Sequence, residues 1–196
     1  MIKINRYILF SIFLFAFSIL PVFANDVSGI RDEAKILYMA GKIPEAQKKI
    51  AEILPEQRSA FDYFLIGNML SDEQLKVKAY EKAIALDDKY YQAYYNLGDY
   101  YFEIKEYDKA IDYLEKAINA KKDFHYGYYN LGCVYLKLKN YNKARKAFSN
   151  AIKYNPQEPD YYYNLGYVYK QLGSTKRADK AIALYNELIK QRNEKD

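Results

Sequence analysis

The sequence repeats one tetrapeptide, Tyr-Asn-Leu-Gly, at a fixed spacing. The three copies begin at Tyr95, Tyr129 and Tyr163, so successive copies start 34 residues apart. A constant period of this size is typical of helical units that stack side by side in an array. The chain is therefore predicted to fold as a helical array rather than as a domain built around one central core.

Small residues recur with the same period and indicate where helices meet. Two helices can approach closely only where the residues at their contact are small. We expect Gly98 and Ala110 to mark the contact between the two helices of one unit. Ala83, Ala117 and Ala151, again 34 residues apart, should let the first helix of the next unit pack on the second helix of each unit. One unit cannot cover its own apolar face, so the stack is the entity that folds.

One unit also carries a nearly complete motif in the order aromatic, x2, Leu-Gly, x2, Tyr, then Ala, x3, Phe and a closing Pro. Its residues are Tyr128, Leu131, Gly132, Tyr135, Ala144, Phe148 and Pro156. Only the leading Trp of the pattern is replaced, by Tyr. The sequence therefore resembles the tetratricopeptide repeat (TPR) family. This resemblance implies an all-α fold, a right-handed superhelical solenoid of helix-turn-helix repeats.

The register of these positions divides the chain into a predicted leader and five repeats. The predicted solenoid covers residues 25–196, with divergent repeats at about 27–55 and 56–90 and regular repeats at 91–124, 125–158 and 159–192. In the second repeat Gly67 precedes Gly98 by only 31 residues, so three residues are missing between Gly67 and Ala83. We expect this deletion in the turn near Ser71, and expect Ser71 with Gln74 to form a capping box for the following helix.

Residues 1–24 have the layout of an export signal. Lys3 and Arg6 precede an apolar run, and Val22-Phe23-Ala24 places small residues three and one before a cut after Ala24. The prediction is a cleaved signal peptide and a periplasmic protein. The alternative is an uncleaved anchor in the inner membrane, because residues 7–23 reach the lower end of the spanning range.

Composition argues against nucleic-acid binding and against a metal or cofactor. The formal net charge is +5, and removal of Lys3 and Arg6 would leave +3, which is too weak to imply a nucleic-acid partner. The chain has one Cys and one His, too few for the usual zinc ligand sets. It has no Gly-rich phosphate loop and no Ser nucleophile elbow. We therefore expect no enzymatic activity and no cofactor.

The resemblance also implies which residues face a ligand in the concave groove, namely the two residues before each Leu-Gly and the residue after the glycine. These are Tyr95, Asn96, Asp99, Tyr129, Asn130, Cys133, Tyr163, Asn164 and Tyr167. A ladder of three Asn amides can bond the backbone of an extended peptide, while Tyr rings supply apolar area with a polar tip. Alternatively, the Asn residues belong to the repeat architecture alone.

Other residues of the same helices have competing interpretations. Cys133 could form a disulfide with another chain, or could be a small, half-buried helix residue. A subset of TPR arrays clamps a C-terminal carboxylate with Lys and Arg, but the corresponding positions here hold Gln92, Tyr126 and Asp160, which argues against that role. The tyrosines before and after the ligand positions are expected to pack between helices: Tyr94, Tyr128, Tyr162, Tyr101, Tyr135 and Tyr169.

These observations predict a protein-protein interaction scaffold that binds a peptide segment of a partner in a groove lined by Tyr and Asn. The residues do not encode the identity of that partner. Two alternatives belong to other functional classes. The tyrosine-rich groove could bind cell-wall glycan, or the arrays could stack end to end through the last helix as a structural protein of the envelope.

Overall fold

The computed structural model describes residues 26–194 and shows ten α-helices and no β-strand in that range. The all-α solenoid predicted from the repeat is confirmed. The predicted signal peptide at residues 1–24 lies outside the described residues. Within residues 26–194, no helix combines the length and the apolar character that crossing a bilayer requires.

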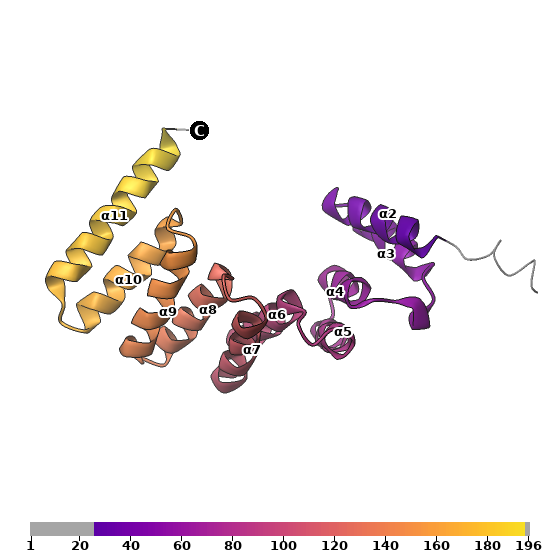
Figure 1. Ribbon diagram of the computed structural model, residues 1–196, viewed down its shortest axis with the longest axis horizontal. Helices are drawn as coiled ribbons and strands as arrows, with labels where there is room; N and C mark the ends of the chain where they lie inside the picture. The colour runs from indigo at the N-terminus through magenta and orange to yellow at the C-terminus, as the bar shows by residue number, and fades with distance from the viewer. Residues whose placement is uncertain (1–25, 195–196) are drawn as a thin grey trace, which may run out of the picture.

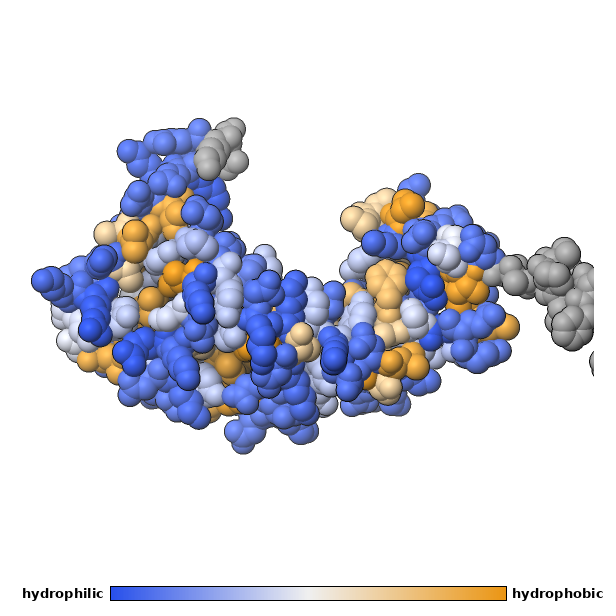
Figure 2. Space-filling model, in the orientation of Figure 1, coloured by the Kyte–Doolittle hydropathy of each residue, from blue (hydrophilic) through white to orange (hydrophobic). Residues whose placement is uncertain are grey.

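The helices form five helix-turn-helix pairs that follow one another along a curve (Figure 1). The pairs are α2 (Val27–Met39) with α3 (Ile43–Ala51), α4 (Ala60–Met69) with α5 (Glu73–Leu86), α6 (Tyr91–Glu103) with α7 (Tyr107–Ala120), α8 (His125–Lys137) with α9 (Tyr141–Tyr154), and α10 (Pro159–Gln171) with α11 (Thr175–Asn193). A short 3-10 helix, η1 (Pro55–Gln57), leads from α3 to α4. Figure 2 shows a hollow between the two raised ends of the molecule.

The helices of a pair meet at the small residues that the sequence singled out. A Cβ atom added to Gly132 would lie 2.6 Å from the Phe148 ring, and one added to Gly98 would lie 2.7 Å from the side chain of Leu114. Both separations are shorter than a normal van der Waals contact, so only glycine fits. The predicted contacts between pairs are also present, because Ala83, Ala117 and Ala151 are fully buried.

The turns within four of the five pairs contain one residue in the left-handed region. These residues are Gly41, Lys105, Lys139 and Gly173, with φ of 72°, 64°, 56° and 71°. Each is the middle residue of a three-residue turn, and the amide that follows Lys139, that of Asn140, donates to the carbonyl of Tyr135 at 2.8 Å. This arrangement closes the C-terminal end of the first helix and normally favours glycine.

The second pair differs from the others in the length of its first helix and in having no left-handed residue in its turn. The turn Leu70–Asp72 has three residues, as many as the turn Ile104–Glu106 between α6 and α7. Helix α4 instead has 10 residues where α6 has 13, and it ends two residues after Gly67. The prediction that the deletion falls in the turn near Ser71 was therefore wrong, and the three missing residues are the last turn of α4.

The caps around this deletion also differ from the prediction. The N-cap of α5 is Asp72, whose side chain accepts from the amide of Leu75 at 2.9 Å, so the predicted capping box of Ser71 and Gln74 was wrong. A complete capping box instead begins α4, where Ser59 and Asp62 bond reciprocally.

The apolar core is divided into three clusters along the solenoid. The largest runs from α7 to α10 and includes Leu114 and Phe148. A small cluster joins α4 and α5 to α6 around Tyr80 and Leu97, and a third occupies α2, α3 and α4 around Ile53. Helix α4 contributes buried residues to both of the smaller clusters.

The last helix closes the array. Tyr185 occupies the position that Ala83, Ala117 and Ala151 hold in the preceding pairs, and its ring lies 5.4 Å from that of Tyr163. Asn186, the next residue, is exposed and replaces an isoleucine of the earlier repeats. The surface of α11 at these positions thus differs from the small and apolar pair on which α6, α8 and α10 pack.

The glycine contacts predict a large effect of one substitution. Gly132→Leu should lower the free energy of unfolding by about 1 to 3 kcal/mol or more, because the new side chain must displace the Phe148 ring. Urea unfolding followed by circular dichroism measures this change. The matched control is Lys137→Leu, which adds the same side chain to an exposed position of α8. Equal destabilisation by both substitutions would contradict the assigned contact.

The left-handed turns predict a stabilising substitution. Lys139→Gly should raise the free energy of unfolding by about 0.5 to 1 kcal/mol, because the relief of left-handed strain exceeds the entropy lost by glycine on folding. Thermal unfolding provides the measurement. The control is Ser71→Gly in the equivalent turn, where the described backbone has no positive φ. Stabilisation by Ser71→Gly of the same size would contradict the explanation.

Candidate functional site

The nine predicted groove residues lie on α6, α8 and α10, and we call this surface the groove face. Three of them are exposed, namely Asp99, Tyr163 and Tyr167. The other six are partly buried, namely Tyr95, Asn96, Tyr129, Asn130, Cys133 and Asn164. The groove face is thus accessible at its C-terminal end and partly closed at its centre by contacts between neighbouring repeats.

The Asn residues bridge each repeat to the one before it. Asn130 donates from Nδ2 to Tyr95 Oη at 3.1 Å and to Asp99 Oδ1 at 3.0 Å. One repeat later, Asn164 donates from Nδ2 to Tyr129 Oη at 3.2 Å. The amide N–H groups of the ladder therefore hold successive first helices together, which is a structural role.

The ladder begins at the irregular second repeat with a different partner. Asn96 donates from Nδ2 to Asn68 Oδ1 at 3.1 Å, and Tyr80 donates to the same oxygen at 2.8 Å. Asn68 lies one residue after Gly67 and thus corresponds to Asp99. The bridging contact is retained although α4 is short.

One polar atom of each ladder amide remains available for a ligand. Within residues 26–194, no hydrogen-bond donor is directed at Oδ1 of Asn96, Asn130 or Asn164. A carboxamide oxygen accepts up to two hydrogen bonds. Three acceptors spaced one repeat apart can therefore bond the N–H groups of an extended chain while the nitrogen atoms stay in the structural ladder.

Aromatic rings surround the ladder. The rings of Tyr95 and Phe124 lie 5.1 Å apart, and those of Tyr129 and Tyr161 lie 4.9 Å apart. Burial is the main cause that raises the pKa of both Tyr95 and Tyr129 to about 12, so both hydroxyls are neutral at physiological pH. Tyr126, which is 50% exposed, extends this surface into solvent and was not among the predicted ligand residues.

The single histidine belongs to the same aromatic group. His125 Nδ1 lies 2.7 Å from Tyr161 Oη, and burial lowers the pKa of His125 below its ordinary value. Both residues stand at or near the start of a first helix. The neutral imidazole is therefore used in a contact between α8 and α10, which the sequence did not reveal because the two residues are 36 positions apart.

Cys133 is partly buried against the core of the central repeats. Burial raises the pKa of its thiol to about 11, so the thiol is protonated at neutral pH. A protonated thiol is a poor nucleophile. The structure thus favours the interpretation of Cys133 as a small, half-buried helix residue over that of a disulfide-forming group.

Asp99 is an exposed carboxylate on α6, at the N-terminal end of the groove face. Desolvation by the neighbouring residues raises its pKa, the nearby Glu103 raises it further, and the hydrogen bond from Asn130 opposes the change. Among the described residues Asp99 has no ion pair. A cation placed beside it would therefore stabilise its ionised form.

The tyrosines that were predicted to pack do so. Tyr135 is 7% exposed, and Tyr101 stacks on Tyr113 at 5.3 Å. On the outer side Lys109, Lys143 and Arg177 lie over Tyr101, Tyr135 and Tyr169 at 5.0, 5.1 and 5.9 Å, one pair in each regular repeat. These cations cover aromatic surface that would otherwise be exposed.

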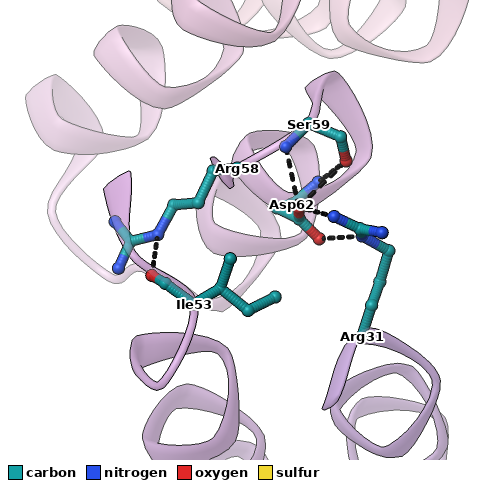
Figure 3. Close-up of polar contacts among 5 residues, drawn as sticks. All are labelled: Arg31, Ile53, Arg58, Ser59 and Asp62. Atoms are coloured by element: carbon teal, nitrogen blue, oxygen red, sulfur yellow. Dashed lines mark hydrogen bonds and ion pairs between the residues drawn. The ribbon is translucent and has the colours of Figure 1, made fainter. Parts of the chain in front are cut away.

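A buried ion pair that the sequence did not reveal joins the first repeat to the second (Figure 3). Asp62 is fully buried, and Arg31 donates to its two oxygens from Nε and Nη2, each at 2.7 Å. Ser59 donates to Asp62 Oδ2 from its backbone N and from Oγ at 2.8 and 2.9 Å. The capping box was visible as a Ser-x-x-Asp pattern, but no local pattern points from Asp62 to Arg31.

The same junction is supported by a second arginine. Arg58 donates from Nε to the carbonyl of Ile53 at 3.1 Å and so braces the connection between α3 and α4 (Figure 3). The ion pair orients α2 against α4. It therefore sets the orientation of the first repeat relative to the rest of the array.

In the part of the chain that the structure describes, no group of three or more His, Cys, Asp or Glu side chains is arranged to hold a metal ion. The chemistry available on the groove face is hydrogen bonding by amides and hydroxyls, aromatic contact and the negative charge of Asp99 and Glu103.

Comparison with known families and structures agrees with this architecture. A sequence model described as tetratricopeptide repeat matches residues 91–124 and 159–194, and one described as TPR repeat matches residues 134–173. No curated protein sequence matches the chain.

Several solved structures of MamA have a similar fold. A crystal structure of MamA has 24% sequence identity and a TM-score of 0.72, and the match covers 82% of this chain and 96% of that chain. MamA 41-end from Desulfovibrio magneticus RS-1 has 23% identity and a TM-score of 0.73, over 86% and 97% of the two chains. The MamA RS-1 ArsTM double mutant has 22% identity and a TM-score of 0.75, over 87% and 98%. These likenesses show the fold.

The ion pair of Arg31 and Asp62 predicts an acid-sensitive junction. Burial raises the pKa of Asp62, but the hydrogen bonds from Arg31 and Ser59 lower it by more, so the net pKa is below its ordinary value. The stabilising contribution of the ionised carboxylate is thus fully present above about pH 4 and is lost as the pH falls through the lowered pKa. Asp62→Asn should cost about 2 to 3 kcal/mol at pH 7.

Urea unfolding at pH 7 and at several lower pH values tests this expectation. The difference between the wild type and Asp62→Asn should shrink as the wild-type carboxylate is protonated. Asp108→Asn, at an exposed position, is the control for loss of one negative charge. A difference that stays constant down to pH 2 would show that Asp62 does not act through its charge.

Proposed function

The chain belongs to the tetratricopeptide repeat family, and on this premise we propose that it is a scaffold that holds an extended segment of a partner protein against the groove face of α6, α8 and α10. The fold supports a protein-protein interaction scaffold in general. The groove as the binding surface is our more specific proposal, and it rests on the chemistry of the ladder amides.

The proposal rests on one observation: within each Asn side chain, the amide nitrogen and the amide oxygen have different roles. The nitrogen of Asn130 bonds Tyr95 and Asp99 of the preceding repeat, which holds the amide in one orientation. Its oxygen has no donor from the described residues. A pre-oriented acceptor loses little entropy when it binds a peptide N–H, so the ladder is suited to backbone recognition.

The remaining groove residues suit contacts with peptide side chains. Tyr163 and Tyr167 are 52% and 46% exposed, and each offers an apolar ring with a hydroxyl at its tip. Nothing in the arrangement provides a nucleophile paired with a base, so the proposed activity is binding without catalysis.

We place this activity in the periplasm, on the strength of the export signal predicted from residues 1–24. If that segment is retained, the scaffold would act from the surface of the inner membrane.

Exposed rings also favour one alternative, which is the binding of cell-wall glycan. Tyr126 and Tyr163 are about half exposed, at 50% and 52%, and tyrosine rings of this kind can pack on sugar faces. End-to-end stacking through the last helix is less well supported, because Tyr185 and Asn186 replace the Ala and Ile that receive a following repeat.

Binding to a displayed library of random extended peptides tests the proposal. The purified protein should enrich a set of peptides, and Asn130→Ala with Asn164→Ala should lose them. The matched control is Tyr95→Phe with Tyr129→Phe, which removes the tyrosine hydroxyls that Asn130 and Asn164 bond in the preceding repeat but leaves the bond of Asn130 to Asp99 and the amide oxygens in place. The control should retain most of the binding.

Two results would count against groove binding by the amides. Equal loss in both double variants would mean that only the stability of the ladder matters. Retention on cell-wall glycan without peptide enrichment, abolished by Tyr163→Ala, would favour the glycan alternative.

A further inference from the structure

A cleft separates α5 from α6 beside the start of the Asn ladder. Its volume is about 470 Å³. Its lining residues are Glu73, Lys76 and Tyr80 from α5 and Asn96, Asp99, Tyr100, Glu103 and Ile104 from α6. Asn96 and Asp99 also belong to the groove face, so the cleft is continuous with the surface on which the proposed peptide lies.

The cleft lies where α4 lacks its last turn. Measured from Gly98, α6 continues for five residues, whereas α4 continues for only two residues after Gly67. The missing turn corresponds to Tyr101, Phe102 and Glu103 of the next repeat. At the start of α5, residues 73–75 are exposed and Lys76 is only partly buried.

The sequence of α5 is adapted to this exposure. In the regular repeats the fourth residue of the second helix is a buried alanine, namely Ala110, Ala144 or Ala178. At the same position α5 has Lys76. A lysine cannot occupy a closed contact between helices. Lys76 therefore helps to keep the cleft open, together with the missing turn of α4.

The charges of the cleft are unbalanced. Lys76 forms an ion pair with Glu73 at 2.6 Å, which neutralises both. Asp99 and Glu103 on the opposite wall have no ion pair within the described chain. Two carboxylates therefore face a cleft whose only cation is already paired, and both desolvation and Glu103 raise the pKa of Asp99.

We propose that this cleft receives a lysine or arginine side chain of the peptide held on the groove face. The inference rests on the proposed function, because the basic side chain belongs to a groove-bound segment. Asp99 and Glu103 would pair with its charge. The partly exposed ring of Tyr100 would contact its methylene groups or its cationic head.

The geometry favours a basic side chain over other occupants. An anion would meet two uncompensated carboxylates. A bare divalent cation would lie close to the ammonium group of Lys76, and the described residues contain no metal-binding cluster. A long cation with an apolar stem matches both the aromatic and the acidic parts of the lining, and the cleft adjoins Asn96, so the backbone and the side chain of one segment can be held together.

The test begins with the displayed peptide library and continues with one enriched synthetic peptide. Peptides enriched by the wild type should share a basic residue at one position. Replacement of that residue by citrulline, for arginine, or by norleucine, for lysine, should weaken binding about tenfold in calorimetry, since a partly desolvated charge pair is lost. This comparison of peptides uses the unaltered protein.

The protein variants should give a matching result. Asp99→Asn with Glu103→Gln should weaken the basic peptide about tenfold and leave the citrulline or norleucine peptide almost unaffected. The matched control is Asp88→Asn with Asp108→Asn, which removes two exposed carboxylates outside the cleft and should change the affinity by less than about twofold.

The possible failures are distinguishable. Enriched peptides without a shared basic residue, still lost in the Asn130→Ala and Asn164→Ala variant, would overturn the cleft and leave groove binding intact. The cleft would also be overturned if replacement of the basic peptide residue weakened binding by the same factor in the wild type and in the Asp99→Asn, Glu103→Gln variant. Absence of any enrichment would overturn the groove proposal and this inference together.

Discussion

Each helix pair in this solenoid depends on a close approach of two helices at a position that holds a glycine or an alanine. In α6 and α8 the side-chain-free face of Gly98 or Gly132 accepts Leu114 or Phe148 from the second helix. In the first pair Ala34 takes the corresponding place and is fully buried. The bulky partner varies, but the first helix keeps a glycine or an alanine at this position, because the partner side chain leaves no room for a larger one. The rest of the array is positioned by these contacts, since each pair presents its second helix to the next pair.

This constraint explains why the irregular second repeat still fits the array. The contact of Gly67 with Tyr80 keeps α4 and α5 in register although α4 is shorter than α6. The cleft lined by α5 and α6 lies beside this shortened repeat. At the neighbouring junction the buried pair of Arg31 and Asp62 fixes the orientation of the first repeat. Both irregular features, the cleft beside α5 and the junction of the first two repeats, thus lie where polar groups replace apolar packing.

In the Asn ladder one side chain serves the fold and, in the function that we propose, also a ligand. Its nitrogen joins neighbouring first helices through Tyr95 and Tyr129, whose hydroxyls are protonated acceptors, since burial raises the pKa of each still further above neutrality, to about 12. Its oxygen faces away from these partners and can accept from a bound chain. The two interpretations that the sequence left open, architecture and recognition, are therefore compatible. The same reasoning applies to Asp99, which accepts from Asn130 and also lines the cleft.

The sequence by itself determined the period, the all-α fold and the small-residue contacts, because a stacked array repeats the same local requirement every 34 residues. It also predicted nine groove residues and showed that three residues are missing from the second repeat. Only the tertiary structure decided that the deletion removes the end of α4, that Asn130 bonds Tyr95, and that Arg31 reaches Asp62. These features depend on side chains from different repeats meeting in space, and the hydrogen-bonding and ionic contacts that result leave no periodic trace in the chain.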